Sequence, residues 1–381
     1  MKTYSEFADE LFTVHPGIRV DLGPGRHFSP EQFHTAVDRI ASAIPAGILS
    51  VSLAGESYEQ RPIRLFTVGS GPVTIFLWSQ MHGDESTATA AIADILKYIG
   101  TGGGRSEVDH LLSRTTIHFL PMLNPDGAAR RRRRTAQDID MNRDALAFRS
   151  PEAVLLKKVR DAAKPAYGYN LHDQELSTVG ETRRLTALAL LAPAFDAARG
   201  DNEVRSRARR LCAAFARVAG RFAPGGLARY DDTFEPRAFG DNMQKWGTST
   251  MLVESGHAPG DPDKESIRRL NFTGILATLF GIATGELLHE PTGPYDLLPP
   301  NFKRAYDCII RSVTVEDDGK RFTADLGLSA QVDTHSEPPL RLVDLGDLHT
   351  FTAMEEIDGR KKSVPRSALK LGEPFDPSLP G

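Results

Sequence analysis

Apolar residues follow two spacings along the chain, one typical of buried strands and one typical of helices. Residues 50–80 hold two extended runs, and 73–78 is almost wholly apolar, which is the pattern of a strand covered on both faces. A helical spacing follows from Ser86 to Tyr98 and ends at Gly100. The alternation continues to residue 284. Strands are expected at 116–122, 167–171 and 248–253, helices at 151–163, 204–219 and 264–284, and 185–191 fits either element.

This alternation of strands and helices sets the fold class. It predicts an α/β fold in which a mixed, largely buried sheet carries helices on both faces. We assign residues 1–50 to a helical lead-in, whose second helix begins at Ser29-Pro30-Glu31, and 51–290 to the main domain. Four prolines between 291 and 300 are typical of a linker. Short alternating runs and a turn at Asp318-Gly319 predict a small β-rich C-terminal domain at 301–381.

Composition narrows the classes of partner and compartment. A formal net charge of −4 gives no basic surplus for a nucleic-acid partner, and we expect none. No apolar stretch approaches the roughly 18 residues that a membrane span needs. The acidic N-terminus is not a secretory signal, so a cytoplasmic protein is expected. The two cysteines, Cys212 and Cys308, provide neither a disulfide framework nor a thiolate zinc site, and the oligomeric state is not indicated.

The spacing His-x-x-Glu, which can supply two zinc ligands from one segment, occurs twice. It is formed by His82 with Glu85 and by His172 with Glu175. Both histidines follow a predicted buried strand, and ligands of α/β sheets bind at the carboxyl ends of the strands. One such histidine is ordinarily a hydrogen-bonded loop residue, but two at neighbouring strand ends rarely coincide by chance. We therefore interpret His82, Glu85 and His172 as candidate metal ligands and Glu175 as a surface acid.

Two further acids need a separate interpretation. Glu31 forms a looser pair with His27, but the predicted start of a helix accounts for it as a first-turn acid. Glu254 ends a third apolar run, 250–253, where a carboxylate is costly unless it is paired or functional. It is either a salt-bridged acid at a strand end or a general base beside a metal-activated water.

Five consecutive arginines, 130–134, stand out in an otherwise acidic chain. Such a run is more often a solvated loop or an anion site than a duplex-binding face. The run lies between Asn124–Gly127, at a predicted strand end, and Asp140–Asp144. A hydrolase that acts on a chain terminus needs guanidinium groups for the free carboxylate and for the developing oxyanion. Some of these arginines could therefore bind such a carboxylate or oxyanion, and most must lie on the surface.

Seven segments resemble, in order, motifs of the zinc carboxypeptidase family of the carboxypeptidase A type. Each motif alone is weakly specific, whereas seven in family order are specific, and together they span about residues 50 to 285. The Asp173-Gln174 pair after His172 is similar to a bacterial-type variant. The segments are Glu56–Ile63, Met81–Glu85, Asn124–Gly127, Arg133–Thr135, Asp140–Arg143, Leu171–His172 and Leu252–Gly256.

The resemblance implies a catalytic domain at 51–290 with one zinc ion per chain on His82, Glu85 and His172. It implies that Glu254 takes a proton from the activated water and passes it to the leaving amine. The activity implied is that of a metallocarboxypeptidase, which hydrolyses the C-terminal peptide bond of a peptide. Tyr230 is a candidate for the family's mobile tyrosine, and an ordinary half-buried tyrosine is the alternative.

The resemblance also implies how a free C-terminal carboxylate is recognised. Asn142 and Arg143 would bind the carboxylate, and Arg133 would stabilise the oxyanion. Because a run of arginines lets the alignment slip, Arg134 or Arg131 fits the position of Arg133 as well.

Other functions compete with this interpretation. An amidohydrolase of the same fold would act on acyl-amino acids or murein-type peptides, and the Asn124–Gly127 turn favours the peptidase. A catalytically silent binding module would keep the fold, but here all three ligands and the base are present. The chain has no Gly-x-Ser-x-Gly elbow and no Gly-x-x-x-x-Gly-Lys loop, which argues against a serine hydrolase and a nucleotide enzyme.

Overall fold

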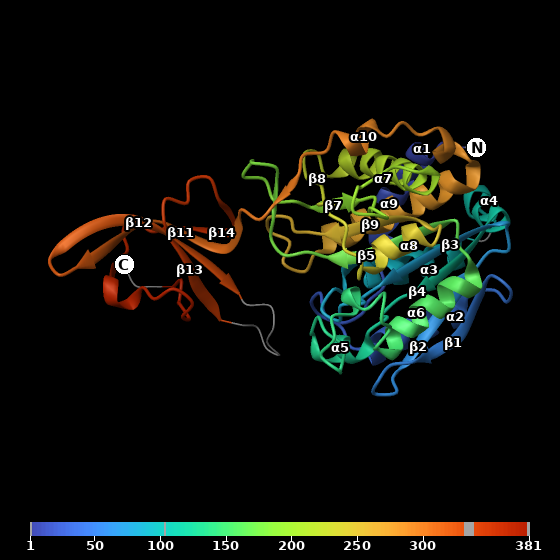
Figure 1. Cartoon of the computed structure of the whole chain (residues 1–381), viewed down its shortest axis with the longest axis horizontal. Coiled ribbons are helices and arrows are strands. Elements are labelled where there is room, and N and C mark those ends of the chain that lie inside the picture. The colour runs from blue at the N-terminus through green and yellow to red at the C-terminus, as the bar shows by residue number, and fades with distance from the viewer. Residues whose placement is uncertain (1, 103, 331–338, 379–381) are drawn as a thin grey trace.

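A mixed sheet forms the centre of the structure, a computed structural model that describes residues 2–102, 104–330 and 339–378. Within these residues, eight strands pair in the order β1-β2-β4-β3-β5-β9-β7-β8 (Figure 1). Their bounds are β1 Leu49–Glu56, β2 Pro62–Val68, β3 Val73–Ser79, β4 Thr115–Leu120, β5 Tyr167–Asp173, β7 Leu188–Leu191, β8 Leu227–Arg229 and β9 Ser249–Ser255.

The middle of the sheet is parallel. Strand β3 pairs in parallel with β4 and β5, and β5 pairs in parallel with β9. The carboxyl ends of these strands therefore meet at one edge, called the carboxyl edge below. Strands β1 and β2 extend the sheet in antiparallel fashion on one side, and β7 pairs antiparallel with β9 on the other. Apolar runs such as β5 and β9 are buried because helices cover both faces of the sheet.

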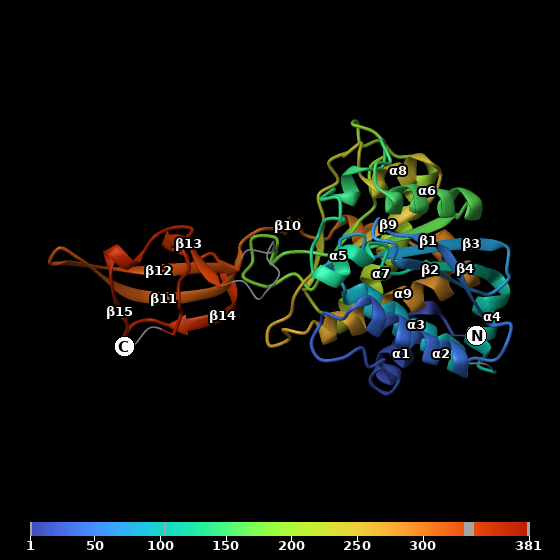
Figure 2. The same ribbon diagram turned by 90° about the horizontal axis from the view of Figure 1, so that it is seen from below.

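Helices lie on both faces, so the predicted fold class is confirmed (Figure 2). On one face α9 is almost wholly buried, because α1, α3, α4 and α7 pack around it. The opposite face carries α6 and α8 together with a second apolar cluster that includes Trp78 and Phe239. The bounds are α1 Tyr4–Ile18, α2 Pro30–Ala43, α3 Thr87–Thr101, α4 Ser106–Arg114, α5 Pro125–Arg130, α6 Pro151–Ala163, α7 Glu203–Phe222, α8 Phe239–Lys245 and α9 Glu265–Thr284.

Local sequence signals account for where several helices begin. The hydroxyl of Ser29 accepts from the backbone N–H of Gln32, and the Gln32 side chain accepts from Ser29 N–H, which caps α2 at its predicted start. Glu31 lies in the first turn of this helix, as expected. Ser150 caps α6 and Asn202 caps α7 more simply, because each side chain accepts one hydrogen bond from a backbone N–H of the first turn.

The structure differs from the sequence-based expectation at several elements. Residues 50–80 form three strands, not two, because the exposed edge strand β1 lacks a clear apolar face. The short helix α4 was not expected, since only Val108 and Leu111 of its nine residues are buried. The ambiguous run 185–191 contains a strand, β7, in the buried part of the sheet.

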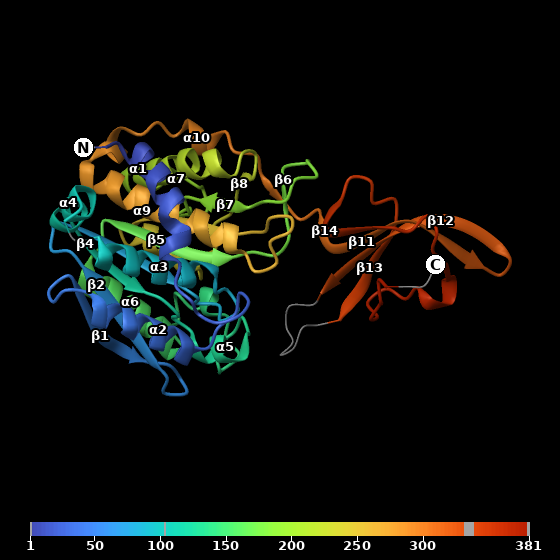
Figure 3. The ribbon, with the colours of Figure 1, turned by 180° about the vertical axis from the view of Figure 1, so that it is seen from behind.

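The C-terminal residues form a second sheet with a core of its own (Figures 1 and 3). A turn at Asp318-Gly319, both with positive φ, joins its two longest strands, as the sequence predicts. The proline-rich segment before it contains α10, Gly293–Asp296, and Tyr295 accepts a hydrogen bond from Ala192 N–H at 3.0 Å. Strand β10, Asn301–Phe302, then pairs with β6, Thr178–Val179. The second sheet comprises β11 Ala305–Asp317, β12 Lys320–Ala330, β13 Leu340–Gly346, β14 Thr352–Asp358 and β15 Ser363–Pro365.

None of the helices in the described part of the chain combines the length and the hydropathy that crossing a membrane requires.

Candidate metal centre

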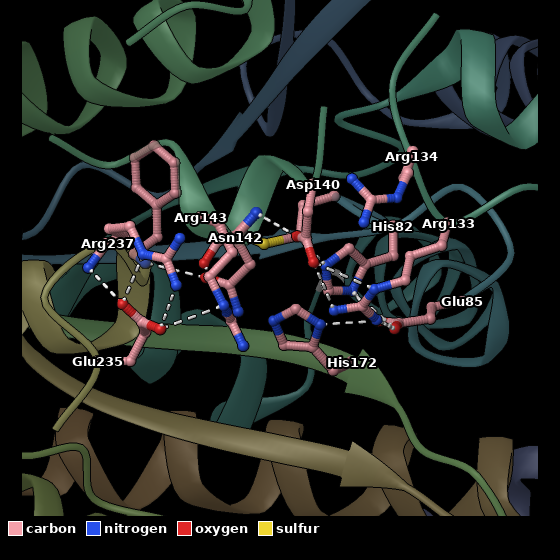
Figure 4. Close-up of polar contacts among 12 residues, drawn as sticks. His82, Glu85, Arg133, Arg134, Asp140, Asn142, Arg143, His172, Glu235 and Arg237 are labelled. Carbon is pink, nitrogen blue, oxygen red and sulfur yellow. Dashed lines mark hydrogen bonds and ion pairs between the residues drawn. The ribbon is translucent and has the colours of Figure 1, made fainter. Parts of the chain in front are cut away.

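His82, Glu85 and His172 come together at the carboxyl edge (Figure 4). Glu85 lies between the two imidazoles, with its Oε1 2.7 Å from His82 Nδ1 and its Oε2 2.7 Å from His172 Nδ1. One ligand atom from each residue lies within 4.8 Å of the others, and all three side chains are buried. Two imidazoles and one carboxylate form the donor set of a catalytic zinc site, so these residues fit the ion that the sequence implies.

A glycine lets the segment with His82 and Glu85 fold tightly against α5. A Cβ on Gly83 would lie 2.1 Å from the backbone carbon of Gly127, so no larger residue fits there without a shift. Gly83 N–H donates to the carbonyl of Arg133 at 3.3 Å. This close backbone packing fixes the turn after β3 and sets the direction of both side chains.

The two neighbouring imidazoles favour the ionised form of Glu85. Burial by itself would raise the pKa of this carboxyl, but the charges and hydrogen bonds of His82 and His172 lower it well below its usual range. For His172 burial dominates and lowers the pKa of the imidazole. For His82 the effect of burial is outweighed by Glu85 and Asp140, which raise its pKa.

Asp140 supports the centre from the opposite side of His82. Its Oδ1 lies 3.1 Å from His82 Nε2, and its Oδ2 lies 3.2 Å from Arg133 Nη2. The hydrogen bond from His82 and the charges of His82 and Arg133 lower the pKa of Asp140, although burial opposes this. A carboxylate on the outer nitrogen of a metal-binding imidazole fixes its tautomer and orientation. Sequence reasoning included Asp140 in a motif but assigned it no role, since only its position relative to His82 reveals one.

Glu254 is held beside the metal ligands by strand pairing. Residues His172 and Glu254 are register partners on the parallel strands β5 and β9, so their side chains share a face of the sheet. The Glu254 side chain is buried, and burial together with the charges of Glu85 and Asp173 raises the pKa of its carboxyl well above the usual range. Tyr230 packs against the apolar cluster that contains Ala189, the register partner of Glu254 on β7, and the charge of Glu254 raises the pKa of its hydroxyl.

The arginine run divides between the centre and the surface. Arg133 Nη1 lies 3.2 Å from Glu85 Oε1, so this side chain faces the metal ligands. Arg134 turns away, and its Nη1 donates to the carbonyl of Asp138 at 3.0 Å in an exposed loop. Arg131 ends α5 in a left-handed conformation and is exposed. Of the three alternatives, Arg133 is the one in contact with the centre.

The side chains of Asn142 and Arg143 lie near the start of α8. The Asn142 side chain accepts from Phe239 N–H at 2.9 Å, which ties it to the first residue of that helix. Arg143 Nε lies 3.4 Å from Glu235 Oε2, and Glu235 also pairs with Arg237 (Figure 4). Glu235 was not expected from the sequence, because no motif includes it.

The remaining candidates from the sequence lie outside the centre. His27 is not one of the residues that could share a metal ion with Glu85 in the described part of the chain. The Glu175 side chain is 63% exposed and pairs with Lys303, as expected for a surface acid.

Comparison with known proteins supports the fold and the resemblance found in the sequence. Residues 34–179 match the family model described as zinc carboxypeptidase. This part of the chain resembles a zinc carboxypeptidase domain. The matched residues include the three candidate ligands, Asp140 and the arginine run, so the resemblance inferred from the motifs is confirmed.

Curated relatives of the chain are distant. The uncharacterised protein ZMO1242 of Zymomonas mobilis is 25% identical over 180 residues, which cover 45% of this chain and 46% of that protein. Carboxypeptidase D of Mus musculus is 29% identical over 119 residues, which cover 26% of this chain and 9% of that protein. The chain therefore spans less than half the length of these curated relatives.

Solved structures share the fold of the main domain. A metallo-carboxypeptidase from Burkholderia cenocepacia has a TM-score of 0.55 and 18% identity, over 68% of this chain and 70% of that one. Carboxypeptidase A from Helicoverpa armigera has a TM-score of 0.53 and 14% identity, over 74% of this chain and 80% of that one. At such low identity these similarities establish the fold alone.

Proposed function

We propose that the chain is a zinc metallocarboxypeptidase that removes the C-terminal residue of a peptide. The observation that carries the proposal is the convergence of His82, Glu85 and His172 beside Glu254 in a zinc carboxypeptidase domain. The three side chains would hold one zinc ion per chain, leaving one coordination position for the substrate or water. Zinc at such a site supplies Lewis-acid polarisation of a carbonyl and an acidified water.

Glu254 is proposed as the general base. Its burial beside Glu85 and Asp173 raises the pKa of its carboxyl, so it can hold a proton taken from water until the leaving amine accepts it. Arg133 would donate hydrogen bonds to the carbonyl oxygen as negative charge develops there. Tyr230, whose pKa is raised by the charge of Glu254, is proposed to border the bound substrate.

Asn142 and Arg143 are proposed to bind the free carboxylate of the substrate. The Arg143 side chain is 40% exposed, which leaves its guanidinium open to a ligand, and it already pairs with the carboxylate of Glu235. That pair shows the chemistry that a peptide C-terminus would offer the same guanidinium.

Metal content of the purified protein tests the metal centre. We expect one equivalent of zinc in the wild type and its loss in His82→Ala and His172→Ala, because each variant leaves two ligands. His27→Ala is the matched control and should keep the metal, since His27 lies outside the cluster. A wild type that takes up no zinc after dialysis would contradict the proposal and favour a silent binding module.

Substrate choice tests the exopeptidase assignment. Arg143→Ala should raise KM for a peptide with a free C-terminus by about 10- to 100-fold, the equivalent of one charge-assisted contact. The same peptide with a C-terminal amide should react slowly with both enzymes and show little difference between them. Arg64→Ala, which removes a surface ion pair with Asp38, is the control. Equal losses on the free and amidated peptides would contradict the role of Arg143 and favour the amidohydrolase.

A further inference from the structure

A buried lysine lies next to the metal centre, and no role has yet been given to it. Lys264 precedes the first residue of α9, and its side chain is 2% exposed. Its Nζ donates to Asp173 Oδ2 and to the carbonyl of Ser255, each at 3.2 Å. The backbone of Lys264 is left-handed, with φ at 54°, a conformation that a residue other than glycine keeps only when its surroundings enforce it. A buried ammonium is tolerated because these acceptors replace its hydration.

The partners of Lys264 are the residues that follow a metal ligand and the base. Asp173 follows His172, Ser255 follows Glu254, and the two are register partners on β5 and β9. The ammonium therefore joins the ends of the two strands one residue beyond the catalytic side chains.

Asp173 connects these strand ends to the ligand Glu85. Its Oδ2 accepts from Thr87 Oγ1 at 2.6 Å, and Thr87 begins α3 two residues after Glu85. Its backbone N–H donates to Glu85 Oε2 at 3.2 Å. The three segments that carry His172, Glu85 and Glu254 thus meet in one hydrogen-bond network. The ammonium group of Lys264 is the cation of this network.

We propose that Lys264 is a positioning residue of the metal centre. This inference rests on the proposed function. Lys264 holds the ends of β5 and β9 and the start of α3 at a fixed spacing. At that spacing the three ligands converge and Glu254 faces them. It touches neither the metal ligands' donor atoms nor the substrate. Without the ammonium, the buried carboxylate of Asp173 loses its cationic partner, and the strand ends lose the group that joins them.

The chain offers a closely matched control on the same helix. Arg268 lies one turn further along α9, is 5% exposed and forms two hydrogen bonds to the buried Asp94, at 2.7 and 2.8 Å. It also donates to the carbonyl of Val20 at 2.8 Å. Arg268→Met therefore removes a buried cation one turn from Lys264, but one whose partners are Asp94 and Val20 and not the ends of β5 and β9.

The first experiment compares zinc affinity and turnover in the two variants. Lys264→Met should bind zinc about 10- to 100-fold more weakly in a chelator competition, the usual effect of disturbing a partner of a metal ligand, here Asp173, whose N–H donates to Glu85. With zinc saturating, its kcat should fall while KM changes by less than about threefold, because Arg143 and Asn142 are untouched. Arg268→Met should lose thermal stability but keep zinc affinity and kcat within about twofold of the wild type. Equal behaviour of the two variants would overturn the inference.

The second experiment needs neither zinc nor substrate. In the metal-free protein, backbone hydrogen exchange at Asp173 and Gln174 should be about tenfold faster in Lys264→Met and unchanged in Arg268→Met, since both amides bond across this edge. If Lys264→Met does not fold, Asp173→Asn and Lys264→Arg replace it. Asp173→Asn should show the same faster exchange at these amides, and Lys264→Arg should largely keep their protection. Protected amides in Asp173→Asn would overturn the inference. A wild type without zinc or turnover would contradict the proposed function instead, and the exchange data would still decide the role of Lys264.

Discussion

The chemistry of the site depends on a few side chains whose partners set their charge. Glu85 is kept ionised by two imidazoles, whereas burial beside other acids raises the pKa of Glu254. The two carboxylates therefore suit different tasks, metal binding for the first and proton transfer for the second. Because the two side chains are identical, position in the fold, and not residue type, separates the roles proposed for them.

A single substitution tests the proton-transfer role. Glu254→Gln should keep zinc and the fold while lowering kcat by about 10²- to 10⁴-fold, because the amide cannot accept a proton from water. Zinc content and steady-state kinetics of the same preparation provide the measurement. Glu175→Gln, at an exposed acid paired with Lys303, should leave kcat unchanged. Turnover by Glu254→Gln close to that of the wild type would refute the assignment.

At the scale of elements, the site depends on parallel strands that end together. Strands β3, β5 and β9 bring segments separated by about 90 residues to one edge, and the register of β5 with β9 pairs His172 with Glu254. The turn after β3 and the start of α5 then pack backbone to backbone at Gly83 and Gly127. Small changes in these elements should therefore affect the metal site without touching a ligand.

Gly83→Ala tests that dependence. The new Cβ would overlap the backbone of α5, so we expect a loss of about 1–3 kcal/mol of stability and reduced zinc affinity. Gly17→Ala, where a Cβ meets no atom within 4 Å, is the control and should have little effect on zinc binding. Denaturant unfolding and zinc content measure both effects. Normal zinc binding in Gly83→Ala would mean that the turn adapts more easily than the packing indicates.

At the scale of the whole molecule, the two sheets have separate cores. The C-terminal strands enclose their own apolar cluster, and β10 pairs with β6 next to it. These features support the proposal that residues 301–381 form a separate domain. Residues 291–300, between the two sheets, also pack against the main domain, because Tyr295 is buried there and accepts a hydrogen bond from Ala192 N–H.

Global stability should depend on pH through His257. Burial, and then the charges of Lys264 and Arg26, lower the pKa of this imidazole to about 2. Below its usual pKa of about 6.5 the unfolded chain takes up a proton that the folded protein does not, so stability falls as the pH decreases. Between pH 6.5 and 5 this costs at most about 2 kcal/mol. His257→Gln should flatten the pH dependence of unfolding in that range, and an unchanged slope would contradict the assignment.

The sequence alone determined the fold class, most of the buried elements and the candidate ligands. Apolar runs and helical spacing are local signals, and motifs in a fixed order identify a family even when each is weak. Elements with a weak apolar pattern were missed. Strand β1 is an exposed edge, and helix α4 buries only two residues.

Only the tertiary structure decided which side chains lie together. It placed Arg133, one of five adjacent arginines, against Glu85, joined Asp140 to His82, paired Glu235 with Arg143 and brought Lys264 to the ends of two strands. These contacts form between segments far apart in the chain, and no local pattern encodes the distance between them. A charged residue's burial and partners set its pKa, so its role follows from where the fold places it.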